Sequence, residues 1–222
     1  MAEFTWSYSS LKEYENCPKK YYEMRVAKNY VFKDTEATIY GKEVHKALED
    51  YVRDGIELAK NYQRFKPFVD SLINIPGDKY PEYEMALTYS KEPCEFNSEH
   101  RWVRGIVDLL IVDKDYAFII DYKTGSNKYP DPKQLRLMAL MTFTHFPEVQ
   151  KIKAGLLFVL KDSFVTEEYH RKDMDKSWSM FEQPLKRLET SYDYNKWQPN
   201  PTGLCGWCPV ETCEHYKPSK RR

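Results

Sequence analysis

Apolar residues recur along this chain at two spacings, every third or fourth position in some segments and every second position in others. The first spacing is typical of an amphipathic helix, and the second of a strand with one buried face. Helices are therefore predicted over residues 5–28, 36–60, 61–76, 133–146 and 173–192. Strands are predicted over residues 83–90, 101–104, 106–112, 116–122, 154–160 and 165–170. This order of elements favours an α/β fold with a central sheet.

Prolines and glycines predict where these elements are interrupted. Pro18 directly follows Cys17, which predicts a helix junction at the cysteine. Gly55 is the expected break in the helix over 36–60. Pro93 indicates a loop after the first strand.

The stretch GIVDLLIVDKDYAFIIDYKTG, residues 105–125, contains two apolar runs around a short charged turn. This pattern predicts a β-hairpin, yet each run carries a carboxylate, Asp108 in the first and Asp121 in the second. Lys123 follows Asp121 by two positions and so lies on the same face of the strand. Burying a carboxylate is costly unless it is paired, hydrogen-bonded or bound to a metal. The hairpin therefore indicates either a divalent-metal site with an adjacent lysine or a buried Asp–Lys ion pair.

The composition fits one soluble domain of generous size. Of 222 residues, 41% are hydrophobic and 31% are charged, and no apolar run reaches the length of a membrane span. The first residues lack the pattern of a signal peptide, so we expect a cytoplasmic protein, in the host cytoplasm if phage-encoded. The net charge is zero, so any binding of nucleic acid depends on a local patch.

Three of the five cysteines form a C-x2-C-x4-C pattern near the end of the chain, and a fourth candidate ligand lies near its start. A disulfide framework is not expected in a cytoplasmic protein. Four thiolates bind either zinc or an iron–sulfur cluster, and in a zinc site His215 could replace one of them. The candidate ligands are Cys17, Cys205, Cys208 and Cys213. Cys94 fits neither pattern and is expected to be a free thiol.

Five features follow one another along the chain: GKEVH, an acid at Glu84, GIVD, DYKTG, and a helix that begins near Gln134. Together they resemble the RecB-type branch of the PD-(D/E)XK nuclease superfamily, from about Ser7 to Cys213. The resemblance implies a restriction-endonuclease-like fold, a mixed sheet flanked by helices, in a single domain over 1–222. The chain departs from the branch at Met138, where a tyrosine is usual.

The resemblance also implies roles for individual residues. The implied catalytic residues are Asp108, Asp121, Lys123, Glu84 and Gln134. The implied metal ligands are His45, Asp108, Asp121 and the backbone carbonyl of Tyr122. Such oxygen-rich ligands suit Mg²⁺ or Mn²⁺ rather than a closed zinc site.

The cysteine arrangement resembles that of AddB, exonuclease V and the CRISPR-associated RecB-like nucleases. It implies a [4Fe–4S] cluster bound by Cys17 and the three late cysteines, with structural zinc as the alternative. Residues 1–30 and 193–217 would then form a clasp around a nuclease core at 36–192.

The resemblance implies a metal-dependent DNA nuclease, most readily an exonuclease that acts on single-stranded ends. The chain lacks the GxxxxGK[ST] motif of an ATP-driven helicase, which favours a stand-alone nuclease. The alternative is a partner-dependent DNA-end-processing or DNA-binding subunit in a recombination, repair or CRISPR-adaptation complex.

Overall fold

A computed structural model describes residues 4–125, 131–161 and 163–217. The chain divides into two compact units. One unit combines Met1–Asp34 with Ser179–Arg222, and the other is Thr35–Trp178. Among the described residues, no helix is both long and apolar enough to cross a bilayer.

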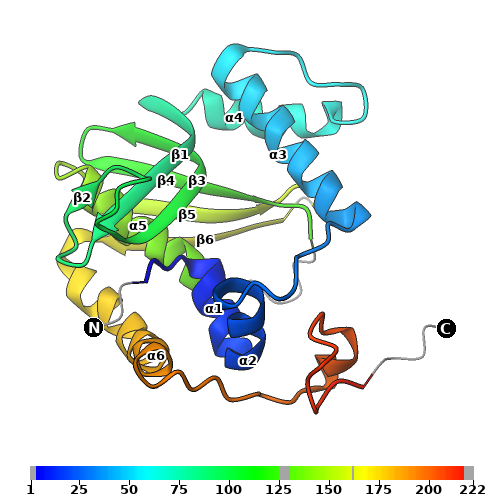
Figure 1. Ribbon diagram of the computed structural model, residues 1–222. Coiled ribbons are helices and arrows are strands. Elements are labelled where there is room, and N and C mark those ends of the chain that lie inside the picture. Colours follow the sequence, from blue (N-terminus) through cyan, green and yellow to red (C-terminus); the bar gives the residue numbers. More distant parts are fainter. Residues whose placement is uncertain (1–3, 126–130, 162, 218–222) are drawn as a thin grey trace. The chain divides into compact units, whose positions relative to one another are not determined.

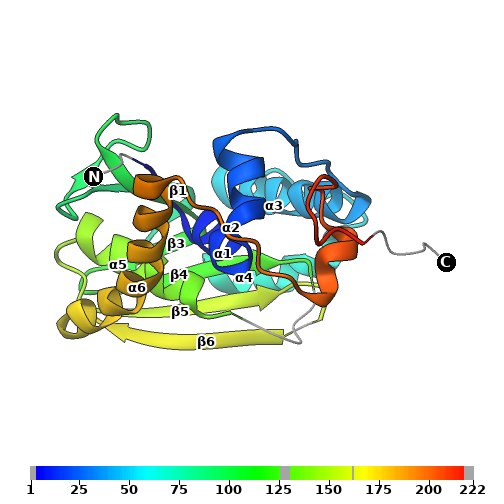
Figure 2. The same cartoon turned by 60° about the horizontal axis from the view of Figure 1, so that its bottom comes forward.

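A six-stranded mixed sheet forms the centre of the Thr35–Trp178 unit (Figures 1 and 2). Its strands are β1 (Asp78–Thr88), β2 (Pro93–Cys94), β3 (Arg101–Asp113), β4 (Tyr116–Lys123), β5 (Lys151–Phe158) and β6 (Ser163–His170). They lie in the order β2-β1-β3-β4-β5-β6, and β4 and β5 are parallel whereas the other neighbours are antiparallel. The helix α5 (Lys133–His145) connects the parallel pair. The predicted mixed sheet flanked by helices is confirmed.

Helices cover both faces of this sheet. On one face, α3 (Glu36–Asp54) and α4 (Lys66–Ile73) pack through Val44 and Val69 against Leu109 of β3 and Ile120 of β4. On the other face lies α5, where the Thr142 hydroxyl donates to the Met85 sulfur at 3.7 Å. Consecutive residues of β4 therefore reach opposite helical layers, because side chains alternate along a strand.

Several predicted boundaries differ from the structure. The helix predicted over 36–60 ends at Gly55, the expected break, which adopts a left-handed conformation with φ +68°. The loop predicted at Pro93 and Cys94 is instead the short strand β2, paired with Ala86 and Leu87. With only two residues, β2 is too short to show a periodicity in the sequence.

Strand β1 begins five residues before its predicted start and contains Pro81. A proline is tolerated there because β2 pairs with β1 only at Ala86 and Leu87, so β1 is an edge strand at Pro81. Glu82, the next residue, has a left-handed φ of +49°, which is uncommon for a residue with a side chain. The backbone irregularity matters because Glu82 belongs to the site described below.

The unit built from both chain ends contains α1 (Tyr8–Asn16), α2 (Pro18–Tyr21) and the π-helix η1 (Tyr22–Val26). Cys17 lies at the junction of α1 and α2, as predicted. The hydroxyl of Tyr14 donates to the Arg187 carbonyl at 2.7 Å, which ties α1 to α6 (Met174–Tyr194). The remaining short helices are η2 (Gln63–Phe65), η3 (Arg171–Asp173) and η4 (Gly203–Trp207).

Candidate metal centre

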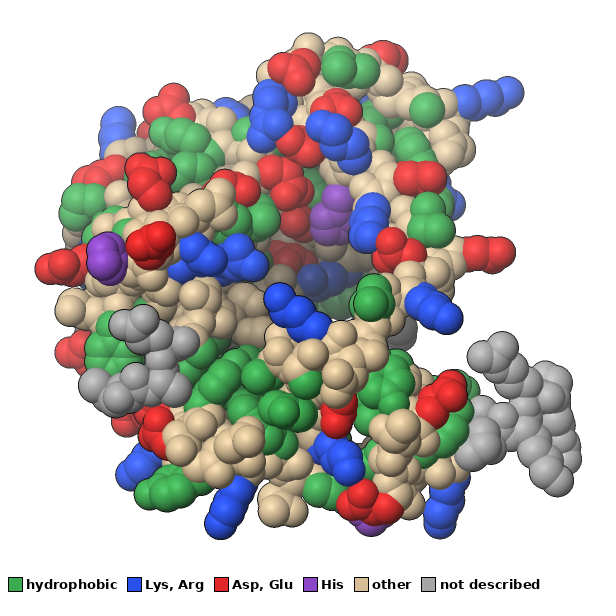
Figure 3. Space-filling view, in the orientation of Figure 1, with side chains coloured by type: hydrophobic (Ala, Val, Ile, Leu, Met, Phe, Trp, Pro, Cys, Tyr) green, Lys and Arg blue, Asp and Glu red, His purple; other side chains and the backbone are tan. Residues whose placement is uncertain are grey.

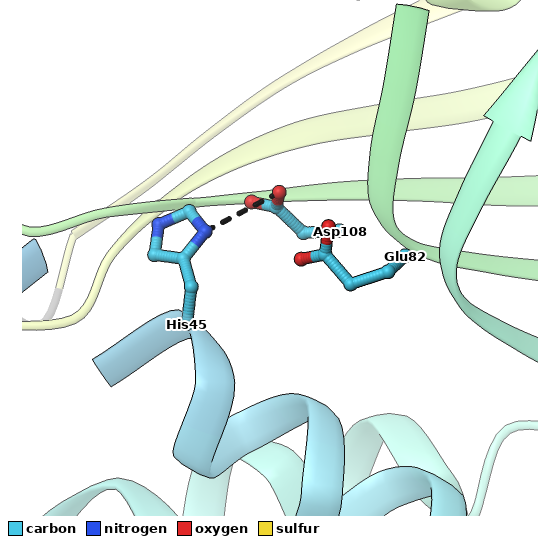
Figure 4. A group of neighbouring side chains, drawn as sticks. All are labelled: His45, Glu82 and Asp108. Atoms are coloured by element: carbon cyan, nitrogen blue, oxygen red, sulfur yellow. Dashed lines mark ion pairs between the residues drawn. The ribbon is translucent and has the colours of Figure 1, made fainter. Parts of the chain in front are cut away.

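Three side chains from three different elements of the Thr35–Trp178 unit converge beside the sheet (Figure 4). They are His45 of α3, Glu82 of β1 and Asp108 of β3, and their ligand atoms all lie within 4.8 Å of one another. The Nδ1 atom of His45 is 3.4 Å from Oδ1 of Asp108. Within the described part of the chain, this is the only group of histidine, cysteine and acidic side chains spaced to hold one ion.

Local structure explains the convergence. His45 follows Val44, which is fully buried and fixes the rotation of α3 against the sheet. Pro81 pairs with Leu109 and Tyr83 with Val107, so Glu82 lies opposite Asp108 on the neighbouring strand. Facing positions on antiparallel strands bring two side chains close together.

Glu84, the expected upstream acid, does not join this group. It is exposed and lies opposite Ile106, two residue pairs farther along the ladder. Glu82 stands in its place. The correction has a physical cause: an 11-residue strand with a left-handed residue at Glu82 breaks the alternation from which the strand was predicted. In the sequence, the only indication of Glu82 is that it is a second acid, two residues before Glu84.

A second polar group lies at the end of β4. Asp121 is 2% exposed, and its Oδ1 accepts a hydrogen bond from Nε2 of Gln134 at 2.6 Å. Nζ of Lys123 donates to Oε1 of Gln134 at 3.0 Å and lies 2.5 Å from Oδ2 of Asp121. That short contact is an ion pair outside hydrogen-bond geometry, so Oδ2 is buried without a hydrogen bond. The predicted common face of Asp121 and Lys123 is therefore observed.

The backbone of β4 connects the two groups. The Tyr122 amide, between Asp121 and Lys123, donates to Oδ2 of Asp108 at 2.6 Å. The Tyr122 side chain points into the α3 layer, where its ring meets His45 edge-on at 6.0 Å between centroids. The role of the Tyr122 carbonyl as a ligand stays a prediction. Met138, where the RecB branch usually has tyrosine, is buried in the core.

These buried acids carry more negative charge than their protein partners offset. Burial, followed by the charge of Asp108, raises the pKa of Glu82 to about 7 and also raises the pKa of Asp121. Burial alone would lower the pKa of His45, but its hydrogen bond to Asp108 and the surrounding carboxylates raise it. A divalent cation would relieve this repulsion, because an opposite charge stabilises the ionised carboxylates.

The donor set fits Mg²⁺ or Mn²⁺. Carboxylate oxygens with one imidazole suit these ions, whereas structural zinc sites use mainly thiolates and several histidines. Oδ2 of Asp121, which pairs with the Lys123 ammonium, adds a further buried carboxylate oxygen.

A cleft of about 750 Å³ opens on this centre. Figure 3 shows a histidine beside a hollow of the surface, with acidic and basic side chains around it. The cleft is lined by residues of α3, β1 and the segments after β4 and β5: Ala37, Thr38, Tyr40, Gly41, Lys42, His45, Lys46, Glu49, Glu82, Thr124, Gly125 and Leu160. The centre is thus accessible to a large ligand.

The four predicted cysteine ligands all belong to the unit of the two chain ends, and all line one cavity there. The amide of Asn200 donates to Sγ of Cys17 at 3.5 Å, and the amide of Thr202 donates to Sγ of Cys205 at 3.3 Å. Lys19 and His215 line the same cavity. No three sulfurs of these described cysteines lie within 4.8 Å of one another. None of the five cysteines forms a disulfide.

The chain is similar to known proteins in both its sequence and its fold. The family model of the PD-(D/E)XK nuclease superfamily matches residues 5–74 and 78–213. A crystal structure described as "Putative exonuclease", from Eubacterium rectale, has a TM-score of 0.52 at 12% identity, covering 98% of this chain and 90% of that one. The crystal structure of SSO0001 has a TM-score of 0.47 at 14% identity, covering 98% and 89%.

No match was found among curated proteins. At such low identity the exonuclease likeness shows the fold alone, whereas the family match spans most of the chain. The chain belongs to the PD-(D/E)XK nuclease superfamily, whose members are metal-dependent nucleases.

Proposed function

We propose that this protein is a RecB-like DNA nuclease that hydrolyses phosphodiester bonds as an exonuclease on single-stranded ends. The observation that carries the proposal is the junction of two polar groups at β4. One is the ligand group of His45, Glu82 and Asp108, and the other is the buried pair of Asp121 and Lys123. A cleft of about 750 Å³ opens beside His45 and Glu82.

The residues that would hold Mg²⁺ or Mn²⁺ are His45, Glu82, Asp108 and Asp121. When bound, such an ion acts as a Lewis acid that polarises the scissile phosphate and its attacking water. Asp108 also accepts the Tyr122 amide, which fixes the carboxylate relative to β4. This preorganisation lowers the cost of bringing the acids together.

Lys123 and Gln134 complete the site. Gln134 donates to Asp121 and accepts from Lys123, so one side chain of α5 orients both residues. The ammonium group of Lys123 is then positioned to stabilise negative charge that develops on the phosphate oxygens during hydrolysis.

The purified protein should degrade an end-labelled single strand faster than the matching duplex, in the presence of Mg²⁺ or Mn²⁺. A chelator should abolish cleavage, and excess metal should restore it, because the acids alone supply no Lewis acid. The assay compares linear single strands, linear duplexes and covalently closed circles. A nicked or linearised circle would contradict a strict exonuclease. Activity only on adding other proteins would instead favour the partner-dependent subunit.

Glu82→Gln should lower the cleavage rate roughly 100-fold, since it removes a ligand charge from the metal centre. Glu84→Gln makes the same chemical change two residues away, on an exposed side chain, and should leave the rate within about twofold. Rates are measured at saturating metal with both variants folded. The opposite ranking would restore Glu84 as the upstream acid.

We further propose that Cys17, Cys205, Cys208 and Cys213 bind a [4Fe–4S] cluster. The shared cavity and the two amide donors to sulfur support this, because amide hydrogen bonds to ligand sulfurs are common tuning elements of such clusters. A tetrahedral zinc ion, with bonds of about 2.3 Å, would hold the sulfurs about 3.8 Å apart. Zinc and the cluster therefore predict different metal contents for the purified protein, which the next experiment measures.

Protein purified without oxygen should be brown and contain about four iron atoms and four acid-labile sulfides per chain. Cys17→Ala should remove the colour and most of the iron, because one of four ligands is lost. Cys94→Ala is the matched control and should retain both, since Cys94 lies in β2 of the other unit. Colourless wild-type protein with one zinc per chain would refute the cluster and favour structural zinc.

A further inference from the structure

Tyr40 lies in the same cleft as two ligands of the metal centre, five residues before His45 on α3. Building on the proposed function, we propose that Tyr40 stacks on an unpaired base of the DNA strand whose phosphate occupies the centre. The partner is therefore a nucleotide in a single strand, adjacent to the bond that is cut.

The Tyr40 side chain is held rigidly. It is half-buried against the α3–α4 core, and its ring lies 6.2 Å from that of Tyr62 at an angle of 56°. Its hydroxyl accepts a hydrogen bond from Nη2 of Arg64 at 3.1 Å. The Arg64 guanidinium in turn lies over the Phe65 ring, 4.8 Å from its centroid. Arg64 is thus a positioning residue for Tyr40, and a rigid aromatic ring loses little entropy when a base binds.

Two glycines, Gly41 and Gly125, line the cleft together with Tyr40. Gly41 follows Tyr40, and a Cβ there would lie only 3.1 Å from Oγ1 of Thr124. A larger residue at Gly41 would therefore narrow the cleft at this point. Gly125 lines the cleft nearby, where a Cβ would meet nothing within 4 Å.

Two lysines also lie along this wall. Lys42 and Lys46 are exposed on α3 and line the cleft with Tyr40, and Nζ of Lys46 pairs with Asp50 at 2.7 Å. Basic side chains beside an aromatic ring are the usual combination for sequence-independent binding of single strands. A base in a duplex has both faces covered by its neighbours, so stacking on Tyr40 selects unpaired ends.

The test uses single strands that carry one abasic residue, moved one nucleotide at a time from the labelled end. For wild-type protein, an abasic residue at one of these positions should raise KM roughly 5- to 20-fold and leave kcat almost unchanged. The reason is that the lost stacking contact is distant from the reacting atoms. Tyr40→Leu should raise KM similarly on intact DNA, and the abasic residue should then have no additional effect. Tyr40→Phe keeps the ring and should retain most of the discrimination.

Arg64→Gln tests the positioning role without removing the ring, and should give a smaller rise in KM at the same position. Tyr194→Leu removes an exposed tyrosine of the other unit and serves as the control.

An abasic effect of equal size in wild type and Tyr40→Leu would overturn the proposal. If wild type cuts no DNA, the proposed function fails, but anisotropy of the same labelled strands with Ca²⁺ still tests the stacking. Binding independent of Tyr40 in that assay would overturn it.

Discussion

Exchange of Asp121 for asparagine is expected to lower the rate of DNA hydrolysis by about 10³-fold. The carboxylate is 2% exposed and lies 2.5 Å from Nζ of Lys123, so its charge acts in a poorly solvated environment. The amide removes a proposed metal ligand and can turn an N–H₂ group toward the ammonium. Losses of this size accompany the removal of single electrostatic groups from active sites. The measurement is single-turnover cleavage of an end-labelled strand with Mg²⁺.

Asp113→Asn is the matched control because Asp113 belongs to the same hairpin, at the end of β3, outside both polar groups. Its cleavage rate should stay within about threefold of wild type. Wild-type activity in Asp121→Asn would remove the carboxylate from the mechanism and, with it, the proposed site. Circular dichroism of both variants separates a catalytic loss from unfolding.

Gly77→Ala is expected to destabilise the protein by about 3 kcal/mol. Gly77 precedes β1 with φ +112°, a region that residues with side chains rarely adopt. A Cβ built there would lie 2.3 Å from the carbonyl oxygen of Val112, which is backbone of β3 and cannot rotate away. The midpoint of thermal unfolding should fall by roughly 6–12 °C, given the size of the chain.

Gly55→Ala controls for the general cost of replacing a left-handed glycine. Gly55 has φ +68°, and a Cβ there would meet nothing within 4 Å. Only the conformational cost remains, so a loss of about 1 kcal/mol is expected. Equal losses in both variants would show that the contact with Val112 relaxes without cost.

The sequence alone predicted the parts of the site that depend on local structure. The turn at residues 113–115 fixes the pairing of β3 with β4, so the buried acids Asp108 and Asp121 could be assigned to adjacent strands. Lys123 could be placed on the face of Asp121 by the two-residue period. Gln134 lies in the first turn of α5, close to the start of the helix predicted over 133–146, so its position could be predicted as well.

Glu82 could not be predicted because its position depends on long-range pairing. A connection of 12 residues separates β1 from β3, so no tight turn fixes their register. The left-handed Glu82 also has no sequence signature, since glycine or asparagine is the residue expected in that conformation. A central sheet was nevertheless predictable, because the longer strands carry apolar patterns of their own, whereas its mixed strand directions were implied by the family resemblance.

The division of the chain has a consequence for folding during translation. Residues 35–178 are contiguous and can fold as they leave the ribosome, whereas α1 hydrogen-bonds through Tyr14 to Ser191, 177 positions later. At about 5–20 residues per second, α1 waits roughly 10–35 s for its partner. During this interval the apolar side chains Trp6, Leu11 and Tyr21 lack their native packing. The N-terminal segment is therefore the part of the nascent chain with the greatest need for a chaperone.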